Sequence, residues 1–317
     1  MTENKGMRDG FGRTVDYLRL SVTEGCNYRC VYCMAEDAVP AGGALSLDEL
    51  AEIGEAAVRC GVRKLRLTGG EPLLREGIVS LCARLRAAEG LGELTLTTNG
   101  SRLSALAAEL KAAGVDRLNL SLDSLRPDRF RAITRRGELR DVLRGLDAAE
   151  AAGFRGTKLN TVLLGGVNDD EIGDLVALTR DRDLSVRFIE LMPMAGSAAF
   201  PKERFLSAGA VLSAVPALEP LGGDGVAELY RAPGHRGTVG LIRPMSHSFC
   251  AFCGRLRVTA DGKLKPCLHS GAEIDLRGLR GEALERALRA GAAAKPAGHR
   301  LSSGRSGTAR PMNRIGG

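Results

Sequence analysis

Short stretches of alternating apolar and polar residues recur along the first 190 residues of the chain. Such alternation is typical of β-strands, because successive side chains point to opposite faces of a sheet. The stretches lie at residues 16–23, 62–68, 93–99, 116–123, 156–164 and 185–190. Helix-like segments lie between most of them. Ser46 and Glu49 have the spacing of a capping box for a helix that Gly61 ends, and a second helix is expected at about 104–113, before Gly114.

Six strands separated by helices predict βα repeats and a parallel sheet, most simply a partial (β/α)6 barrel of TIM type. An antiparallel sheet with one face in water is the alternative. From about residue 193 the chain is rich in Pro, Gly and Ser, with short strands near 227–231 and 238–242. We therefore predict an α/β fold with two parts, a barrel over residues 1–232 and a C-terminal α+β extension over residues 233–317.

The two faces of the predicted strands differ in polarity. One face collects leucines: Leu18, Leu20, Leu65, Leu67, Leu94, Leu96, Leu118, Leu120 and Leu122. The other collects polar residues: Arg19, Ser21, Lys64, Arg66, Thr68, Thr95, Thr97, Asn99, Asn119, Ser121, Asp123, Lys158, Asn160 and Arg187. Helices must cover the leucine face, so the polar face points inward. Closed barrels usually fill their interior with branched apolar side chains, so this interior predicts a large, polar, anionic ligand.

The charge of the chain is concentrated near its C-terminus. The 317 residues carry a formal net charge of +7, and no acidic residue follows Glu285. The cations after Glu285 are Arg286, Arg289, Lys295, Arg300, Arg305, Arg310 and Arg314. Such a tail suits either a disordered arm for polyanions or a segment that folds back over an anionic ligand. Aromatic residues are only 4% and Trp is absent, which leaves little material for stacking on bases, so we expect no nucleic-acid partner.

No targeting or membrane-spanning segment is evident. The N-terminal residues "MTENKGMRDGFGR" lack the apolar core of a signal peptide, and no uncharged apolar stretch approaches the length of a membrane helix. We therefore expect a cytoplasmic protein without a membrane partner. In that compartment eight cysteines are metal ligands more often than disulfides. Cys60 and Cys82 stand apart from the others, and we expect buried thiols at both positions.

Three cysteines crowd into the sequence "CNYRCVYC", at Cys26, Cys30 and Cys33. Tetrahedral metal sites and iron–sulfur clusters take four ligands. Three thiolates can hold three corners of a [4Fe-4S] cube and leave one iron open for another molecule. A zinc site completed by a distant histidine is the alternative.

A second triad has the spacing C-x2-C-x13-C, at Cys250, Cys253 and Cys267. Asp261 and Gly262 between them predict a hairpin turn. Pairing across this turn sets Leu256 roughly opposite Cys267 and so brings that cysteine back toward the other two. The flanking residues His247 and His269 leave a Cys3His zinc site as the alternative.

The first cysteine loop, with Tyr32 before its third cysteine, resembles the cluster loop of the radical S-adenosylmethionine enzymes. The sequence "TGGEPLL" at residues 68–74 resembles their Gly-Gly-Glu motif. The second triad, together with "GRLRV" and the terminal "RIGG", narrows the resemblance to the GTP 3',8-cyclase family of molybdenum cofactor biosynthesis. The similarity runs over nearly the whole chain. Two local departures are a shortened stretch after the first triad, "MAEDAVPAGGALSLDEL", and "TEGCN" in place of the usual Asp-Arg before Cys26.

The resemblance implies roles for individual residues. The first triad would hold a [4Fe-4S] cluster whose open iron chelates S-adenosyl-L-methionine, which makes Cys26, Cys30 and Cys33 catalytic together with Arg257. The cofactor would be lined by Tyr32, Gly70, Ser121 and Met192. The second triad would hold a second [4Fe-4S] cluster facing the guanine of GTP. The positions that match GTP contacts are Arg19, Arg66, Thr97, Lys158, Arg255, Leu256 and Arg257.

The resemblance also implies the reaction and its partners. A 5'-deoxyadenosyl radical would take the ribose 3' hydrogen of GTP, and ring closure at C8 of the guanine would give (8S)-3',8-cyclo-7,8-dihydroguanosine 5'-triphosphate. An external electron donor, transfer of product to cyclic pyranopterin monophosphate synthase and a homodimer are further expectations. The tail that ends in Gly316 and Gly317 is expected to reach the substrate. The alternatives are another radical enzyme with an auxiliary cluster, acting on a peptide or small molecule, and a zinc-containing nucleic-acid-binding protein.

Overall fold

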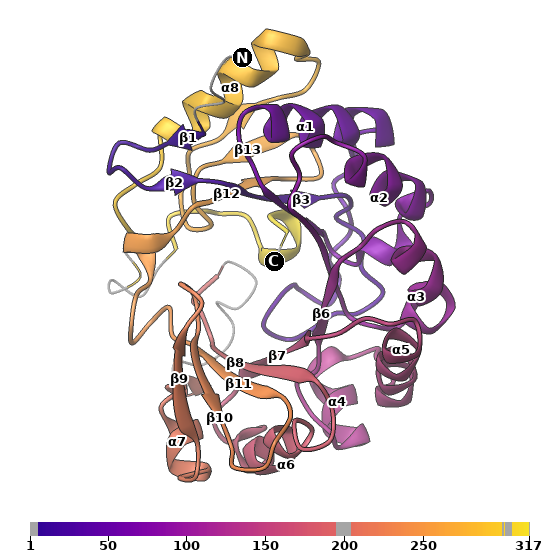
Figure 1. Ribbon diagram of the computed structural model, residues 1–317, viewed down its shortest axis with the longest axis vertical. Helices are drawn as coiled ribbons and strands as arrows, with labels where there is room; N and C mark the ends of the chain where they lie inside the picture. The colour runs from indigo at the N-terminus through magenta and orange to yellow at the C-terminus, as the bar shows by residue number, and fades with distance from the viewer. Residues whose placement is uncertain (1–5, 195–203, 300, 302–305, 317) are drawn as a thin grey trace.

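One curved sheet runs through the molecule (Figure 1). The computed structural model describes residues 6–194, 204–299, 301 and 306–316. The central strands are β3 (Tyr17–Ser21), β4 (Lys64–Thr68), β5 (Glu93–Thr98), β6 (Arg117–Ser121), β7 (Thr157–Leu163) and β8 (Leu184–Glu190). Each pairs in parallel with the next. The six predicted strands are therefore confirmed, and the antiparallel alternative is wrong.

Further strands extend this sheet at both ends. β11 (Thr238–Ile242) lies parallel to β8, and β12 (Arg255–Val258) lies parallel to β3. Antiparallel strands follow on each side: β10 (Glu228–Arg231) and β9 (Glu219–Gly223) beyond β11, and β13 (Lys263–Lys265) and β14 (Ile274–Asp275) beyond β12. Because β9 and β14 end the strand order, the described strands form an open ring. The division into parts at residue 232 stays a prediction.

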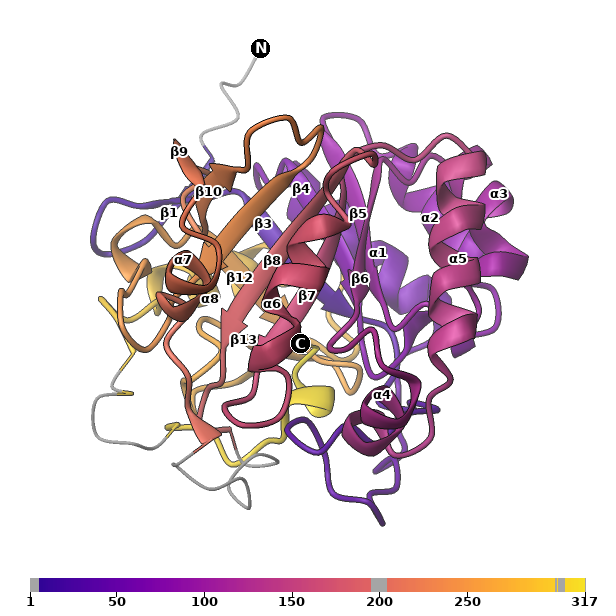
Figure 2. The same cartoon turned by 90° about the horizontal axis from the view of Figure 1, so that it is seen from below.

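Helices cover the outer face of the ring (Figure 2). They are α1 (Leu47–Arg59), α2 (Ile78–Arg86), α3 (Leu103–Ala112), α4 (Pro127–Thr134), α5 (Leu139–Ala151), α6 (Ile172–Ala177), α7 (Ala210–Ala214) and α8 (Gly281–Ala293). The leucines of the predicted apolar face are completely buried in the core that these helices share with the sheet. A separate two-stranded sheet pairs β1 (Met7–Arg8) with β2 (Thr14–Val15). No helix among the described residues has the length and apolar character needed to cross a membrane.

Local signals in the sequence set the ends of several elements. The Ser46 hydroxyl accepts a hydrogen bond from the Glu49 N–H at 3.2 Å, and a Glu49 carboxylate oxygen accepts one from the Ser46 N–H at 2.8 Å. This is the predicted capping box at the start of α1. Gly61 adopts φ +100° just after the helix, a conformation that costs little only for glycine.

The predicted hairpin around Gly262 is present, with β12 and β13 as its strands. Its register pairs Arg257 with Lys265. The prediction that set Leu256 roughly opposite Cys267 therefore differs from the structure by one residue. The difference is small, because Cys267 still returns to the side of the cavity where the other two cysteines of its triad lie.

Close packing of α5 against the chain that leads into α3 allows a test of this core. A Cβ atom on Gly145 would lie 2.7 Å from the Gly100 carbonyl oxygen and 3.0 Å from Leu103 Cβ. Gly145→Ala is expected to lower the free energy of unfolding by about 1–3 kcal/mol, because main chain must move to admit the methyl group. Urea denaturation of the cluster-free chain, followed by circular dichroism, measures the change.

Gly173→Ala is the matched control, because a Cβ on this helical glycine of α6 meets no atom within 4 Å. Removing a helical glycine there is expected to raise the stability by about 0.5–1 kcal/mol. Equal denaturation midpoints for the two variants would contradict the packing described here.

Candidate active site

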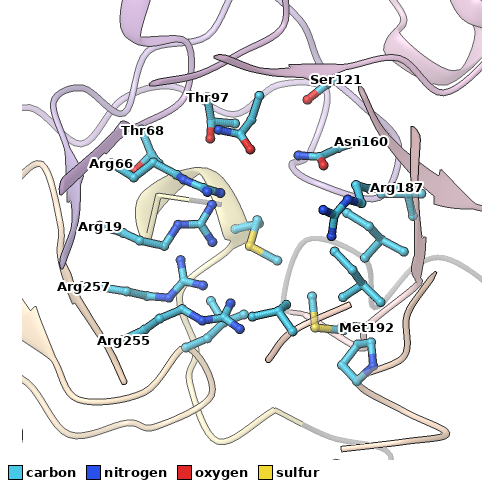
Figure 3. A pocket seen from close by; sticks show the side chains of 18 of the residues that line it. Arg19, Arg66, Thr68, Thr97, Ser121, Asn160, Arg187, Met192, Arg255 and Arg257 are labelled. Carbon is cyan, nitrogen blue, oxygen red and sulfur yellow. The ribbon is translucent and has the colours of Figure 1, made fainter. Parts of the chain in front are cut away.

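The inward face of the sheet surrounds a cavity of about 590 Å³ (Figure 3). This volume is typical of sites for small molecules. All six central strands, and the loops that follow them, contribute polar side chains to its lining. These residues are Arg19, Lys64, Arg66, Thr68, Thr97, Asn99, Asn119, Ser121, Asp123, Lys158, Asn160 and Arg187. The predicted polar interior is therefore confirmed.

One side of the cavity is an arginine wall, formed by Arg19, Arg66, Arg255 and Arg257. The strand register places Arg257 beside Arg19, and Arg19 beside Arg66. Neighbouring strands lie about 4.8 Å apart, so the side chains of these neighbours leave the sheet on one face at that spacing. In Figure 3 the four guanidinium groups of the wall project into the cavity from one side, and Arg187 projects from the other.

The electrostatics of the arginine wall favour an anion. Burial, with the neighbouring charge of Arg257, holds the pKa of Arg19 well below its ordinary value. Burial and the charge of Arg255 lower the pKa of Arg257 to about 10. Both shifts show that the charged forms are destabilised by loss of water and by like charges nearby. A negatively charged ligand would relieve both effects.

Several buried donors of residues that line the cavity have no hydrogen-bond partner within the described parts of the chain. They include the hydroxyl groups of Tyr28, Thr68 and Thr97 and one terminal nitrogen of Arg255, Nη2. Buried polar groups are almost always hydrogen-bonded, because leaving one unsatisfied costs about 1–3 kcal/mol. These groups therefore mark positions where a polar ligand would donate or accept.

Across the cavity, Asp224 joins two more cations. One of its carboxylate oxygens lies 3.1 Å from Lys158 Nζ and 3.0 Å from Arg187 Nη1. Burial acts to raise the pKa of Asp224, but Arg187, the Ala227 N–H and Lys158 together keep it far below its ordinary value. Burial and the charge of Arg187 lower the pKa of Lys158 to about 8. Lys158 therefore lines the cavity as predicted, but it does so already paired with a carboxylate.

The first cysteine triad lies in the loop after β3, and all three of its cysteines line the cavity. The loop is fixed to the C-terminal end of α4, because Arg29 N donates to Thr134 O at 2.9 Å and Val31 N donates to Ile133 O at 3.0 Å. Burial raises the pKa of the Cys26 thiol to about 11 and that of Cys33 to about 12. Thiolates at these positions therefore require a compensating metal, whose binding releases the protons.

Two glycines after β4 let the chain run against the cysteine loop. A Cβ on Gly70 would lie 2.3 Å from the Gly25 carbonyl oxygen, and one on Gly69 would lie 2.5 Å from that of Thr23. Gly70 N donates to Thr23 O at 2.7 Å. Glycine is therefore needed at both positions, and Gly70 lines the cavity next to the first triad. Glu71, buried directly after them, accepts from Thr98 Oγ1 and Asn99 N, both at 2.6 Å.

A buried carboxylate orients the aromatic residue of the cysteine loop. Tyr32 donates its hydroxyl to Asp123 at 2.6 Å, and Val162 N donates to the other oxygen of the same carboxylate at 2.9 Å. Asp123 follows β6 immediately after Ser121 and Leu122, and Met192 follows β8. Tyr32, Ser121 and Met192 all line the cavity, and their contact with a cofactor stays a prediction. The role of Asp123 was not predicted, because its position at the end of a strand does not reveal its partner.

The second triad faces the same cavity from the side of β12. Cys250 and Cys253 precede this strand, Cys267 follows β13, and all three line the cavity. Burial acts to raise the pKa of Cys253, but the nearby charges of Arg255 and Lys295 lower it below its ordinary value. Both triads thus open onto one space. Cys60 and Cys82, in contrast, are completely buried outside it, as expected.

The histidines do not complete the second triad in the way that the zinc alternative required. His247 is exposed and lies outside the cavity lining. His269 lines the cavity, but its ring contacts His299 with centroids 5.4 Å apart, and its Nδ1 lies 3.1 Å from Ser306 Oγ. Across residues 6–194, 204–299, 301 and 306–316, no group of three His, Cys, Asp or Glu side chains is arranged to hold a single metal ion.

The C-terminal tail returns to the interior of the ring, where its yellow ribbon is seen in Figure 1. Asn313 N donates to the Cys33 sulfur, and Arg257 Nη1 donates to Gly316 O at 2.6 Å. Gly316 has φ +84°, and a Cβ there would lie 2.4 Å from Thr68 Oγ1. The tail therefore contacts both the first triad and the arginine wall. Gly317 lies outside the described residues.

Ion pairs also fix part of the tail, whose charge alone was compatible with a disordered arm. Arg310 forms ion pairs with Asp261 at 2.9 Å and with Glu273 at 2.7 Å. Arg314 lies 3.6 Å from the Glu24 carboxylate. Arg300 and Arg305 lie outside the described residues. Arg310 and Arg314 are therefore paired with acidic residues of other segments and do not belong to a free arm.

Leu256 differs from the other residues that the resemblance named as GTP contacts. Leu256 is completely buried in the leucine core and does not line the cavity. It lies between two members of the arginine wall, and the period of two in a strand turns its side chain to the opposite face. Contact between Leu256 and a ligand in the cavity is therefore restricted to its main chain.

The family comparisons agree with this geometry. A model of the Radical SAM superfamily matches residues 20–179, and a Molybdenum Cofactor Synthesis C model matches residues 184–301. The GTP 3',8-cyclase of Peptoclostridium acidaminophilum is 50% identical to this chain and covers 99% of it and 100% of its own length. The chain belongs to the GTP 3',8-cyclase family. The family member from Pseudomonas entomophila (strain L48) is 48% identical over 98% of this chain and 97% of its own length.

The cofactors expected from the sequence, S-adenosyl-L-methionine and two [4Fe-4S] clusters, are those of the GTP 3',8-cyclase family. Membership of this family replaces both alternatives drawn from the sequence, the peptide- or small-molecule-modifying radical enzyme and the zinc-containing nucleic-acid-binding protein. A crystal structure of Streptococcus suis SuiB bound to its precursor peptide SuiA has the same fold, with a TM-score of 0.64 at 12% identity. It covers 90% of this chain and 67% of the SuiB chain.

Asp123 gives the site a testable dependence on pH. Burial raises its pKa from 3.8 to about 6, against the opposing hydrogen bonds from Tyr32 and Val162. The folded chain therefore keeps a proton that the unfolded chain has lost, and stability is expected to fall as pH rises from about 4 to 6. Asp123→Asn is expected to flatten this slope and to gain about 1–3 kcal/mol at pH 7. Urea unfolding of the cluster-free chain at several pH values measures it.

Asp174→Asn, at an exposed position of α6, is the control and is expected to leave the slope as it is. A slope that is the same in wild type and Asp123→Asn would contradict the raised pKa.

Proposed function

We propose that the six clustered cysteines and the arginine wall hold the two reactants of the GTP 3',8-cyclase reaction in this one cavity. The reaction converts GTP to (8S)-3',8-cyclo-7,8-dihydroguanosine 5'-triphosphate, the first step of molybdenum cofactor biosynthesis. The observation that carries the proposal is the arrangement of the lining, because two cysteine triads and four guanidinium groups face the same space. The residues at the site fit the family's cofactors in the number and chemistry of their donors.

Cys26, Cys30 and Cys33 would hold the first [4Fe-4S] cluster at three corners. When bound, this cluster and S-adenosyl-L-methionine supply a 5'-deoxyadenosyl radical. The main chain beside Gly70 would bind the cofactor's amino group through its carbonyl oxygens, since the Gly70 N–H is already donated to Thr23. Tyr32, held by Asp123, would line the cofactor together with Ser121 and Met192, since all three line the cavity.

The arginine wall would bind the triphosphate of GTP, which carries about four negative charges at neutral pH. The chain contains no G-x4-G-K-[ST] loop whose main chain could cradle phosphates. Guanidinium groups bind phosphate oxygens through paired hydrogen bonds, which suits Arg19, Arg66 and Arg257 to this task. Lys158 would exchange its present partner Asp224 for a phosphate oxygen. Thr97 Oγ1 and Arg255 Nη2 would donate to the substrate, since neither atom has a hydrogen-bond partner among the described residues.

Cys250, Cys253 and Cys267 would hold the second [4Fe-4S] cluster at the other end of the cavity, toward the guanine. The protein's own contribution is to hold two molecules in one orientation, which replaces a bimolecular barrier worth as much as about 7–11 kcal/mol in favourable cases. The surrounding protein also excludes water from reactive intermediates. An external electron donor, delivery of product to cyclic pyranopterin monophosphate synthase and a homodimer stay predictions.

An anaerobic assay tests the function. The reconstituted chain is expected to contain about eight irons and to form 5'-deoxyadenosine together with the cyclised nucleotide when GTP and a reductant are present. ATP is the matched control, because it has the same triphosphate and a different base. A chain that purifies without iron, or that forms no cyclised product from GTP, would overturn the proposal.

Arg257→Ala tests the arginine wall. Loss of a charged hydrogen bond costs about 1.5–3 kcal/mol, so the apparent KM for GTP is expected to rise about tenfold or more. Cleavage of S-adenosyl-L-methionine without GTP is expected to change much less. Arg286→Ala, at an exposed position of α8, is the control. Equal loss of both activities in Arg257→Ala would remove the proposed role in GTP binding.

Cys267→Ala tests the second triad. Iron content is expected to fall from about eight to about four per chain, while cleavage of S-adenosyl-L-methionine persists and cyclisation stops. Cys82→Ala, which removes a buried thiol outside the cavity, is expected to leave the iron content unchanged. Unchanged iron in Cys267→Ala would contradict the assignment of this residue as a ligand.

A further inference from the structure

A buried lysine follows helix α8 and reaches toward the second triad. Lys295 is only 4% exposed, and its ammonium group donates to Arg255 O at 2.7 Å and to Pro266 O at 3.0 Å. The same nitrogen lies 4.0 Å from Cys253 Sγ. Arg255 lies two residues after Cys253, and Pro266 lies directly before Cys267. One ammonium group therefore ties together the two chain segments that carry these cysteines.

The segment that follows Lys295 reaches the remaining cysteine. A Cβ on Gly298 would lie 3.4 Å from Cys250 Cβ and 3.7 Å from its sulfur. Arg13 strengthens this contact, because its guanidinium group donates to Cys250 O at 2.6 Å and to Ala297 O at 2.9 Å. Residues 295–298 thus touch every segment that contributes a thiol to the second triad.

The charge of Lys295 has no carboxylate partner within the described part of the chain, since its hydrogen-bond partners are two carbonyl oxygens and a sulfur. Lys265 on β13 is completely buried and shows the usual arrangement, with its ammonium group 3.1 Å from the Glu273 carboxylate. Burying an unpaired charge is costly, so such charges normally lie beside an opposite one. We therefore expect the opposite charge to come from the cysteine thiolates and the cluster that they hold.

We propose that Lys295 positions the second triad and raises the reduction potential of the cluster that the triad holds. This inference rests on the proposed function in assigning a [4Fe-4S] cluster to these cysteines. An oxidised cube with three thiolates carries a net charge of about −1, and reduction by one electron makes it about −2; the net charge and hydrogen bonds to sulfur set its potential. A fixed cation at the sulfur stabilises the reduced form more than the oxidised form.

Two substitutions separate the positioning role from the charge. Lys295→Gln keeps an NH2 group for the two carbonyl oxygens and removes the charge, whereas Lys295→Met removes both. We expect Lys295→Gln to keep about eight irons per chain and to shift the reduction equilibrium of the second cluster about tenfold toward the oxidised form. For a one-electron couple this shift is about 59 mV to more negative potential. We expect Lys295→Met to lose iron from the second triad, toward about four per chain.

The measurement is an anaerobic redox titration of the reconstituted chain followed by electron paramagnetic resonance. S-adenosyl-L-methionine is added in a parallel titration to identify the signal of the first cluster, to which it binds. Arg286→Gln is the control, and its potential is expected to equal that of wild type because water and salt screen the charge at this exposed position of α8. An unchanged potential in Lys295→Gln, an equal shift in Arg286→Gln, or full iron in Lys295→Met would each overturn the corresponding part of the proposal.

Iron content and potential are measured without GTP, so this test is separate from the test of the reaction. Wild type that contains about eight irons but does not cyclise GTP would overturn the proposed function and leave the role of Lys295 standing. Wild type without iron at the second triad would overturn both.

Discussion

Repulsion between like charges is the constraint around which this structure is organised. Arg257, Arg19 and Arg66 occupy adjacent positions on three neighbouring strands, and all three face a cavity sheltered from water. Their charges would destabilise the sheet if nothing opposed them. The leucine face supplies the opposing term, because its buried side chains contribute roughly 1.5–3 kcal/mol each. The fold is thus stabilised by packing outside the ring, and its interior keeps a cluster of like charges.

Much of this arrangement could be predicted from the sequence, because alternate residues of a strand point to opposite faces of the sheet. The period of two assigned Arg19, Lys158 and Arg187 to the interior and the leucines to the core, and the structure confirms both. The same period placed Leu256 on the outer face, although the family resemblance had named it among the contact positions. The parallel pairing of β11 and β12 with the ends of the sheet was not predicted, because long-range pairing leaves no local pattern.

The candidate site, like the fold, could be predicted only in part from the sequence. The cysteines were predictable, because their chemistry requires a particular residue type at a short spacing. Asp224 and Lys295 were not predictable, because each lies in an irregular segment and its role depends on a contact with a residue far away in the sequence. Asp224 lies in a glycine-rich turn between β9 and β10, and Lys295 belongs to a tail whose charge suggested a free arm. A functional residue is predicted most reliably from sequence when the motif that reveals it lies in the same segment as the residue itself.

The mounting of the arginine wall on adjacent strands has a consequence for selectivity. The separation of its charges is set by main-chain hydrogen bonds between strands, about 4.8 Å apart. Substitutions in the surrounding core or loops cannot alter this pitch without breaking a strand pair. In the proposed complex, this fixed separation would favour ligands whose negative charges are spaced to match the strands.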